Sequence, residues 1–160
     1  SDLDYEFKEM LSPWDLKNCR EAGEAIADAI WKQKKIVIIG DYDCDGATAV
    51  SVGILGLQAL GAFNVSYLIP DRDKDGYGLS PQLVDRAAAA GAELIITVDN
   101  GISSVAAVEH AKTLGIEAVV TDHHLPGDEI FGGCGRHLLR VNRRALRTPR
   151  QRRLPERKTA

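Results

Sequence analysis

The sequence has few cysteines, few aromatic residues and no long hydrophobic run. Its three cysteines, in 160 residues, follow no Cys-x-x-Cys spacing, which argues against a disulfide framework or a structural zinc site. No stretch approaches the roughly 18 apolar residues that a membrane-spanning helix requires. The first residues are acidic and contain proline, unlike a signal peptide. We therefore expect a cytoplasmic protein with no membrane partner.

Basic residues are also scarce, except in the last part of the sequence. Residues 1–130 contain 10 Lys/Arg against 22 Asp/Glu, whereas residues 131–160 contain 10 Lys/Arg against one acid. The second stretch is rich in arginine and shows no helical or strand period, so its composition predicts disorder. A basic arm for nucleic acid is the alternative. We expect one folded domain over residues 1–130, followed by a disordered Arg-rich tail over residues 131–160.

The remaining sequence alternates between strand and helix patterns. Short apolar runs predict strands at residues 36–39, 65–69, 94–98 and 116–121. Helical spacing, with Ser or Ser-Pro before and Gly after most segments, predicts helices at residues 12–34, 46–60, 81–90 and 105–114. This order predicts an α/β fold, a parallel sheet with helices on both faces. A dinucleotide-binding domain is disfavoured, because no Gly-x-Gly-x-x-Gly follows a strand.

Three aspartates stand where the first predicted strand ends. The apolar run 36–39 leads through one glycine into Asp41, Asp43 and Asp45. Open parallel sheets bind ligands beyond the carboxyl ends of their strands, so these side chains should line a site. Three carboxylates within five residues repel one another unless a cation lies among them. Their oxygen ligands suit a hard divalent cation.

Polar residues also follow two other predicted strands. Asp99 comes directly after the third strand, and His123 comes directly after the fourth. Neighbouring parallel strands lie about 5 Å apart, so their ends can bring these two residues beside Asp43 and Asp45. A mixture of carboxylates and imidazole suits Mn²⁺ or a related metal, and the surplus of carboxylates suits two ions.

Several segments resemble the motifs of a known family. Residues 40–46 (GDYDCDG), 98–102 (VDNGI) and 121–126 (TDHHLP) are similar to the first three motifs of the DHH phosphoesterases. Residues 75–80 (DGYGLS) resemble the branch of this family that degrades single-stranded DNA from the 5′ end in DNA repair and recombination. The likeness spans about residues 10–130.

The resemblance implies a Rossmann-like DHH domain and a role for each motif residue. It implies catalytic support from Asp41 and Asp122. It also implies that His124 binds the scissile phosphate or assists departure of the leaving group. The ligands of Mn²⁺ or Mg²⁺, as two ions, would be Asp43, Asp45, Asp99 and His123.

Three further residues are candidate contacts for substrate. Thr48 lies in the first turn of a predicted helix, and helix N-termini favour phosphate. Gly101 lies in the turn of the second motif, which a routine structural turn also explains. Arg72 is one of few cations in the acidic body, so it can meet a substrate phosphate, with an ordinary surface role as the alternative.

The resemblance also implies parts that this sequence does not contain. Family members have a fourth-motif aspartate and a separate substrate-binding domain, and the exonuclease branch adds an oligonucleotide-binding fold. The likeness stops after Glu129, as it would in a truncated or frame-disrupted gene product. We therefore expect an incomplete nuclease domain that binds single-stranded DNA weakly. The alternative is a non-catalytic α/β module.

Overall fold

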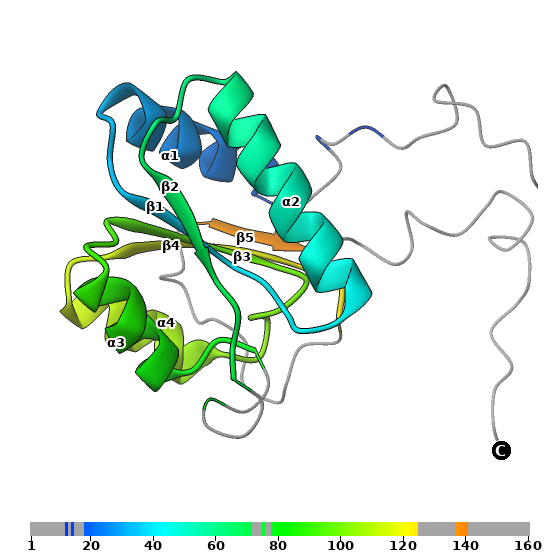
Figure 1. Cartoon of the computed structure of the whole chain (residues 1–160), viewed down its shortest axis with the longest axis vertical. Helices are drawn as coiled ribbons and strands as arrows, with labels where there is room; N and C mark the ends of the chain where they lie inside the picture. Colours follow the sequence, from blue (N-terminus) through cyan, green and yellow to red (C-terminus); the bar gives the residue numbers. More distant parts are fainter. Residues whose placement is uncertain are drawn as a thin grey trace, which may run out of the picture.

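The computed structural model describes residues 12, 14, 18–71, 75 and 78–124, together with the backbone of residues 137–140. Helices and strands alternate along this part of the chain (Figure 1). None of its helices is long and apolar enough to cross a bilayer. The elements are α1 (Cys19–Trp31), β1 (Ile36–Ile39), α2 (Cys44–Ala59), β2 (Val65–Leu68), α3 (Pro81–Ala89), β3 (Leu94–Val98), α4 (Val105–Thr113), β4 (Glu117–Asp122) and β5 (His137–Arg140).

The strands form one parallel sheet in the order β2-β1-β3-β4-β5. Parallel neighbours need a crossover connection, and a helix provides it between each pair of successive strands from β1 to β4. The chain runs from β1 outward to β2 and then returns past β1 to β3. The strand order therefore reverses between β1 and β3. In open parallel sheets, this switch point is where ligands bind.

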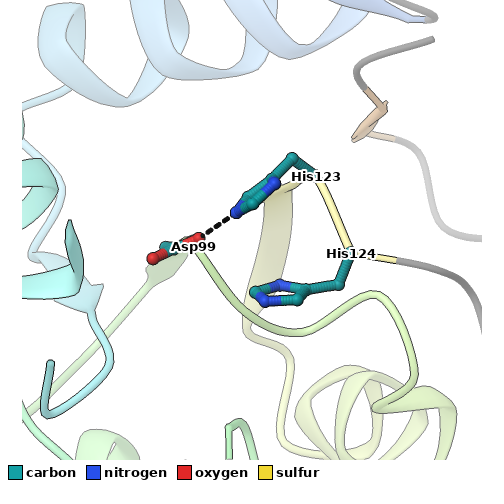
Figure 2. A group of neighbouring side chains, drawn as sticks. All are labelled: Asp99, His123 and His124. Carbon is teal, nitrogen blue, oxygen red and sulfur yellow. Dashed lines mark ion pairs between the residues drawn. The ribbon is translucent and has the colours of Figure 1, made fainter. Parts of the chain in front are cut away.

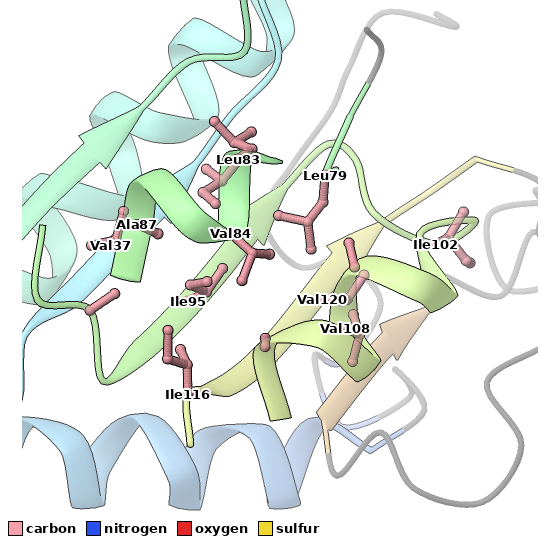
Figure 3. Close-up of a cluster of buried hydrophobic side chains, with 14 residues drawn as sticks. Val37, Leu79, Leu83, Val84, Ala87, Ile95, Ile102, Val108, Ile116 and Val120 are labelled. Atoms are coloured by element: carbon pink, nitrogen blue, oxygen red, sulfur yellow. The ribbon is translucent and has the colours of Figure 1, made fainter. Parts of the chain in front are cut away.

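Helices cover both faces of the sheet, which confirms the predicted α/β architecture (Figure 1). Ile36 and Ile38 of β1 pack in a cluster with α1 and α2. Val37 and Ile39 pack in the cluster of α3 and α4, part of which is drawn in Figure 3. All four side chains are at most 1% exposed, so a strand without polar alternation is expected. Burial of each such side chain contributes roughly 1.5–3 kcal/mol.

Two helices begin at residues other than those predicted. α1 begins at Cys19 rather than near Ser12, because Asn18 adopts a left-handed φ of 61° that a right-handed helix cannot continue. α2 begins at Cys44 rather than at Gly46. Its earlier start follows from Asp43, whose side chain accepts a hydrogen bond from the Gly46 N–H and caps the helix.

β5 lies in the stretch for which composition predicts a disordered tail. Its backbone pairs in parallel with β4, with Val119 opposite His137. A composition averaged over residues 131–160 does not show a four-residue segment that contains two adjacent leucines. The strand therefore differs from the predicted disorder at residues 137–140. The rest of the predicted tail lies outside the described residues, and the boundary at residue 130 stays a prediction.

Candidate metal centre

Asp41 is a buried residue of the turn that joins β1 to α2. Its side chain is 2% exposed and accepts a hydrogen bond from the Tyr42 N–H at 2.7 Å. The first turn of α2 packs directly on this residue, because a Cβ at Gly46 would lie only 2.6 Å from both N and O of Asp41. Glycine at this position is therefore a steric requirement. The Asp41 backbone therefore lies directly against the first turn of α2.

The next two aspartates lie on the surface at the start of α2. Asp43 and Asp45 are exposed, and Oδ1 of Asp43 accepts the Gly46 N–H at 2.8 Å. Acidic side chains at a helix N-terminus are stabilised by the helix dipole. Thr48 is also exposed, and its hydroxyl donates to the Cys44 carbonyl at 2.7 Å. This cap hydrogen bond uses Oδ1 of Asp43, and the second oxygen of the carboxylate takes no part in the cap.

Asp99 follows β3 in a left-handed backbone conformation, with φ of 61°. Its N–H donates to the Thr121 carbonyl at 3.0 Å, which places its side chain beside the end of β4. There Oδ1 of Asp99 lies 2.8 Å from Nε2 of His123 (Figure 2). The Asp99 side chain is 11% exposed and the His123 side chain 55% exposed. The pair therefore faces solvent mainly through the imidazole.

Asp122 is the last residue of β4 and is almost completely buried. Its side chain is 2% exposed. Oδ1 lies 2.7 Å from Nδ1 of His124 and 2.9 Å from the His124 N–H, and Oδ2 accepts the Ile102 N–H at 2.9 Å. These contacts orient the His124 ring, and the catalytic support expected from Asp122 stays a prediction.

Three side chains lie close enough to bind one metal ion. Single ligand atoms of Asp99, His123 and His124 lie within 4.8 Å of one another, and the two rings have centroids 4.5 Å apart (Figure 2). One carboxylate and two imidazoles form a donor set that Mn²⁺ accepts. The cluster combines two predicted ligands with His124. Within the described part of the chain, Asp43 and Asp45 lie outside this cluster.

The roles of Gly101 and Arg72 as substrate contacts remain predictions. Gly101 is buried with φ of 103°, and a Cβ there would lie 2.8 Å from Oγ1 of Thr97. Packing alone therefore requires glycine at this position. Arg72 lies outside the described residues.

Sequence reasoning did not single out Asn100. This residue is 0% exposed and links the ends of β1 and β3 through its side chain. An Asp-Asn-Gly segment is common in turns, so its letters alone indicate only a turn. The available signal was position: this turn directly follows a buried, mostly apolar strand in a parallel sheet.

The sheet and the acidic and imidazole side chains along its carboxyl edge define a DHH-type domain. The family described as "DHH family, N-terminal domain" matches residues 35–134. The chain therefore belongs to the DHH family, which confirms the resemblance of its motifs.

Similar proteins within this family carry the name RecJ. The chain is 54% identical over 130 residues to the single-stranded-DNA-specific exonuclease RecJ of Salmonella typhimurium, which covers 81% of the chain and 22% of that protein. It is 45% identical over 122 residues to the RecJ of Bacillus subtilis, which covers 76% of the chain and 15% of that protein. The chain thus spans less than a quarter of the length of these relatives.

Two solved structures share the fold at substantial sequence identity. One is a crystal structure of exonuclease RecJ bound to manganese, with a TM-score of 0.71 and 36% identity over 82% of this chain and 33% of that chain. The other is RecJ from Thermus thermophilus in complex with Mn²⁺, with a TM-score of 0.67 and 32% identity over 82% of this chain and 18% of that one. Both similar structures hold manganese.

Proposed function

We propose that this chain forms the metal-binding part of an exonuclease domain that hydrolyses single-stranded DNA from the 5′ end. The cluster of Asp99, His123 and His124 at the carboxyl edge of the sheet is the observation that carries this proposal. The similarity to single-stranded-DNA-specific exonucleases and to manganese-bound structures supports it. We further propose that the chain acts in the cytoplasm, in DNA repair and recombination.

The donor set fits Mn²⁺, with Mg²⁺ as the alternative cofactor. Asp99 and His123 would hold one ion, and the exposed Asp43 and Asp45 would contribute to a second. Bound divalent ions neutralise charge on a phosphodiester and lower the pKa of a bound water. Asp41 keeps the turn that bears the exposed aspartates in place, since it packs directly under the start of α2.

His124 is the side chain that we assign to the substrate phosphate. Its Nδ1 contacts the buried Asp122 carboxylate, so its ring orientation is fixed by a residue with little freedom to move. The opposite nitrogen, Nε2, is then the one that can hold or transfer a proton at the phosphate. Thr48, Gly101 and Arg72 complete the proposed substrate contacts.

A non-catalytic α/β module is the second candidate. The excess of acidic residues over residues 1–130 favours it, because an acidic surface repels the phosphates of DNA.

An exonuclease assay separates the two candidates. The purified chain is incubated with 5′-labelled single-stranded DNA and Mn²⁺, beside an Asp43→Ala/Asp45→Ala variant. Glu21→Ala/Glu24→Ala removes two exposed acids from α1 and is the charge-matched control. Metal-dependent nucleotide release that the Asp43/Asp45 variant loses and the control keeps supports the nuclease. Mn²⁺ binding without any release supports the non-catalytic module.

A further inference from the structure

The buried side chain of Asn100 joins the two strands that flank the switch point. Its Nδ2 donates to the carbonyl of Ile39, the last residue of β1, at 3.1 Å. The same nitrogen donates to the carbonyl of Val98, the last residue of β3, at 2.8 Å. The backbone ladder between these strands ends at the Ile39–Thr97 pair. Asn100 therefore continues the connection beyond the last backbone pair.

The hydrogen bond from Nδ2 of Asn100 to the Val98 carbonyl joins the residues on either side of Asp99. It closes a short turn in which Asp99 holds its left-handed φ of 61°. Residues other than glycine rarely adopt this conformation, because Cβ approaches the following carbonyl oxygen. The turn is held from its other side, where the hydroxyl of Thr97 donates to the Asn100 carbonyl at 2.7 Å. These bonds together fix the backbone of the turn that carries the Asp99 side chain.

The hydrogen bonds identify the donor function of Asn100 as the important one. Both partners of Nδ2 are carbonyl oxygens, so reversing the amide would place oxygen against oxygen. Oδ1 of Asn100 is buried without a hydrogen-bond partner in the described part of the chain. An unpaired buried acceptor destabilises the folded state. The two donated bonds are therefore what this residue contributes.

We propose that Asn100 is a positioning residue of the metal centre. Its carboxamide ties the end of β1, from which Asp41, Asp43 and Asp45 follow, to the turn that orients Asp99. Through this link it sets the distance between the acidic segment that follows β1 and the turn that carries Asp99, which lie on either side of the switch point. The inference rests on the proposed metal-dependent function, and it assigns to the second motif a structural task besides its metal ligand.

The decisive variant is Asn100→Leu, which keeps the branched shape and the number of side-chain heavy atoms and removes both donated hydrogen bonds. Metal-free hydrogen–deuterium exchange should become about tenfold faster at residues 40–46 and 98–103, because both segments lose their common anchor. Mn²⁺ affinity, measured by electron paramagnetic resonance, should fall by about 10- to 100-fold, as is usual when a residue behind a ligand is replaced. Asn100→Ser, which keeps one donor, serves if the leucine variant does not fold.

Gln33→Met is the matched control. Gln33 makes the same kind of bridge at the amino ends of the strands, before β1 and β2. Its Nε2 donates to the carbonyls of Ile30 at 2.8 Å and Gly61 at 3.0 Å. Its loss should speed exchange only around residues 30–34 and 61–63 and leave Mn²⁺ affinity unchanged.

Unchanged exchange at residues 40–46 in the Asn100 variant would overturn the inference. An equal loss of Mn²⁺ affinity in the Gln33 variant would do the same, since any destabilising change would then suffice. A different result bears on the proposed function: if the unmodified chain binds no Mn²⁺, that function is wrong. The exchange measurement uses no metal and still decides whether Asn100 couples the two segments.

Discussion

His124 gives two hydrogen bonds to one oxygen of Asp122. Its backbone N–H lies 2.9 Å and its Nδ1 lies 2.7 Å from Oδ1. An ionised carboxylate only accepts hydrogen bonds, so the proton of a neutral His124 ring must be on Nδ1. The buried carboxylate thus selects the tautomer of the histidine that we assign to the substrate phosphate.

Asp122→Asn tests this tautomer selection. The amide oxygen of asparagine is a weaker acceptor than a carboxylate, so part of the neutral imidazole population should move its proton from Nδ1 to Nε2, which nitrogen-15 resonances of His124 report. We expect the free energy of unfolding to fall by about 1–3 kcal/mol, because a buried acceptor arrangement is disrupted. Asp85→Asn is the control, since Asp85 contacts His110 at 2.7 Å but is 63% exposed. An unchanged His124 tautomer in the Asp122 variant would contradict the assignment.

Gly46→Ala should destabilise the turn above Asp41. The added Cβ would lie 2.6 Å from backbone atoms, which cannot move aside as a side chain can. We expect a loss of about 1–3 kcal/mol in urea unfolding. Gly56→Ala in the same helix meets no atom within 4 Å and should instead stabilise by about 0.5–1 kcal/mol. Similar effects of the two substitutions would show that the close approach is not restrictive.

Mn²⁺ should stabilise the chain through Asp99. A ligand that binds only the folded state at 100 times its dissociation constant adds about 2.7 kcal/mol, which a thermal unfolding series measures. Asp99→Asn should abolish most of this stabilisation, because it removes the charge of one ligand. Glu109→Gln, an exposed change on α4, should retain it. An equal metal effect in both variants would exclude Asp99 as a principal ligand.

Two serines at helix starts should differ in their contribution to stability. Oγ of Ser80 accepts the Leu83 N–H at 3.2 Å and caps α3, whereas Ser104 precedes α4 without a side-chain cap bond. Ser80→Ala should therefore lower the free energy of unfolding by about 1 kcal/mol. For Ser104→Ala we expect a much smaller change in the same chemical denaturation experiment. The reverse order would contradict the cap geometry.

Lys34 should contribute a pH-dependent ion pair between the α1–β1 connection and β4. The Glu117 carboxylate, 2.8 Å from Nζ, raises the pKa of Lys34 above its ordinary value of 10.5. A raised lysine pKa gives stability that is complete below the unfolded pKa and is lost as pH rises through the folded pKa. Lys34→Met should cost about 0.2–1 kcal/mol near neutral pH, and this difference should shrink at strongly alkaline pH.

Lys32→Met is the comparison for that experiment. Lys32 pairs with Asp28 at 2.8 Å, but its side chain is 58% exposed against 21% for Lys34. Solvent screens the exposed pair more strongly, so its removal should change unfolding less. A pH-independent cost of Lys34→Met would indicate that the alkyl chain, rather than the charge, stabilises this junction.

Much of the fold could be predicted because its signals are local. The apolar runs place β1 and β3 correctly, since strands covered on both faces need no polar alternation. Gly61, Gly91 and Gly115 stand with positive φ where predicted helices end, as residues without Cβ do at such ends. The buried face of α2 has a weaker local signal, because apolar residues occur all round this helix. Val50 and Leu57 are buried, while Val52 and Leu55 are exposed.

The site could be predicted only as far as strand order allows. Residues that follow adjacent strands can meet, and Asp99 and His123 do so at the ends of β3 and β4. Asp43 and Asp45 follow β1, which is also a neighbour of β3, yet they lie outside the cluster that the described residues form. Hydrogen-bond partners depend on the exact path of each turn, which residue spacing does not give. For that reason the cap made by Asp43, the hold of Asp122 on His124 and the bridge made by Asn100 appear only in three dimensions.

The strand order also dictates when the centre can assemble. β1 pairs with β3, and the contact at their start, from the Lys35 N–H to Oε2 of Glu93, spans 58 residues. A chain leaving the ribosome exposes its first aspartates well before β3 exists. Pairing of such distant segments is slow, on the order of milliseconds to seconds in sheets built from non-local contacts. A metal ion at the proposed centre would therefore bind late in folding, after the sheet is complete, and would stabilise the sheet rather than nucleate it.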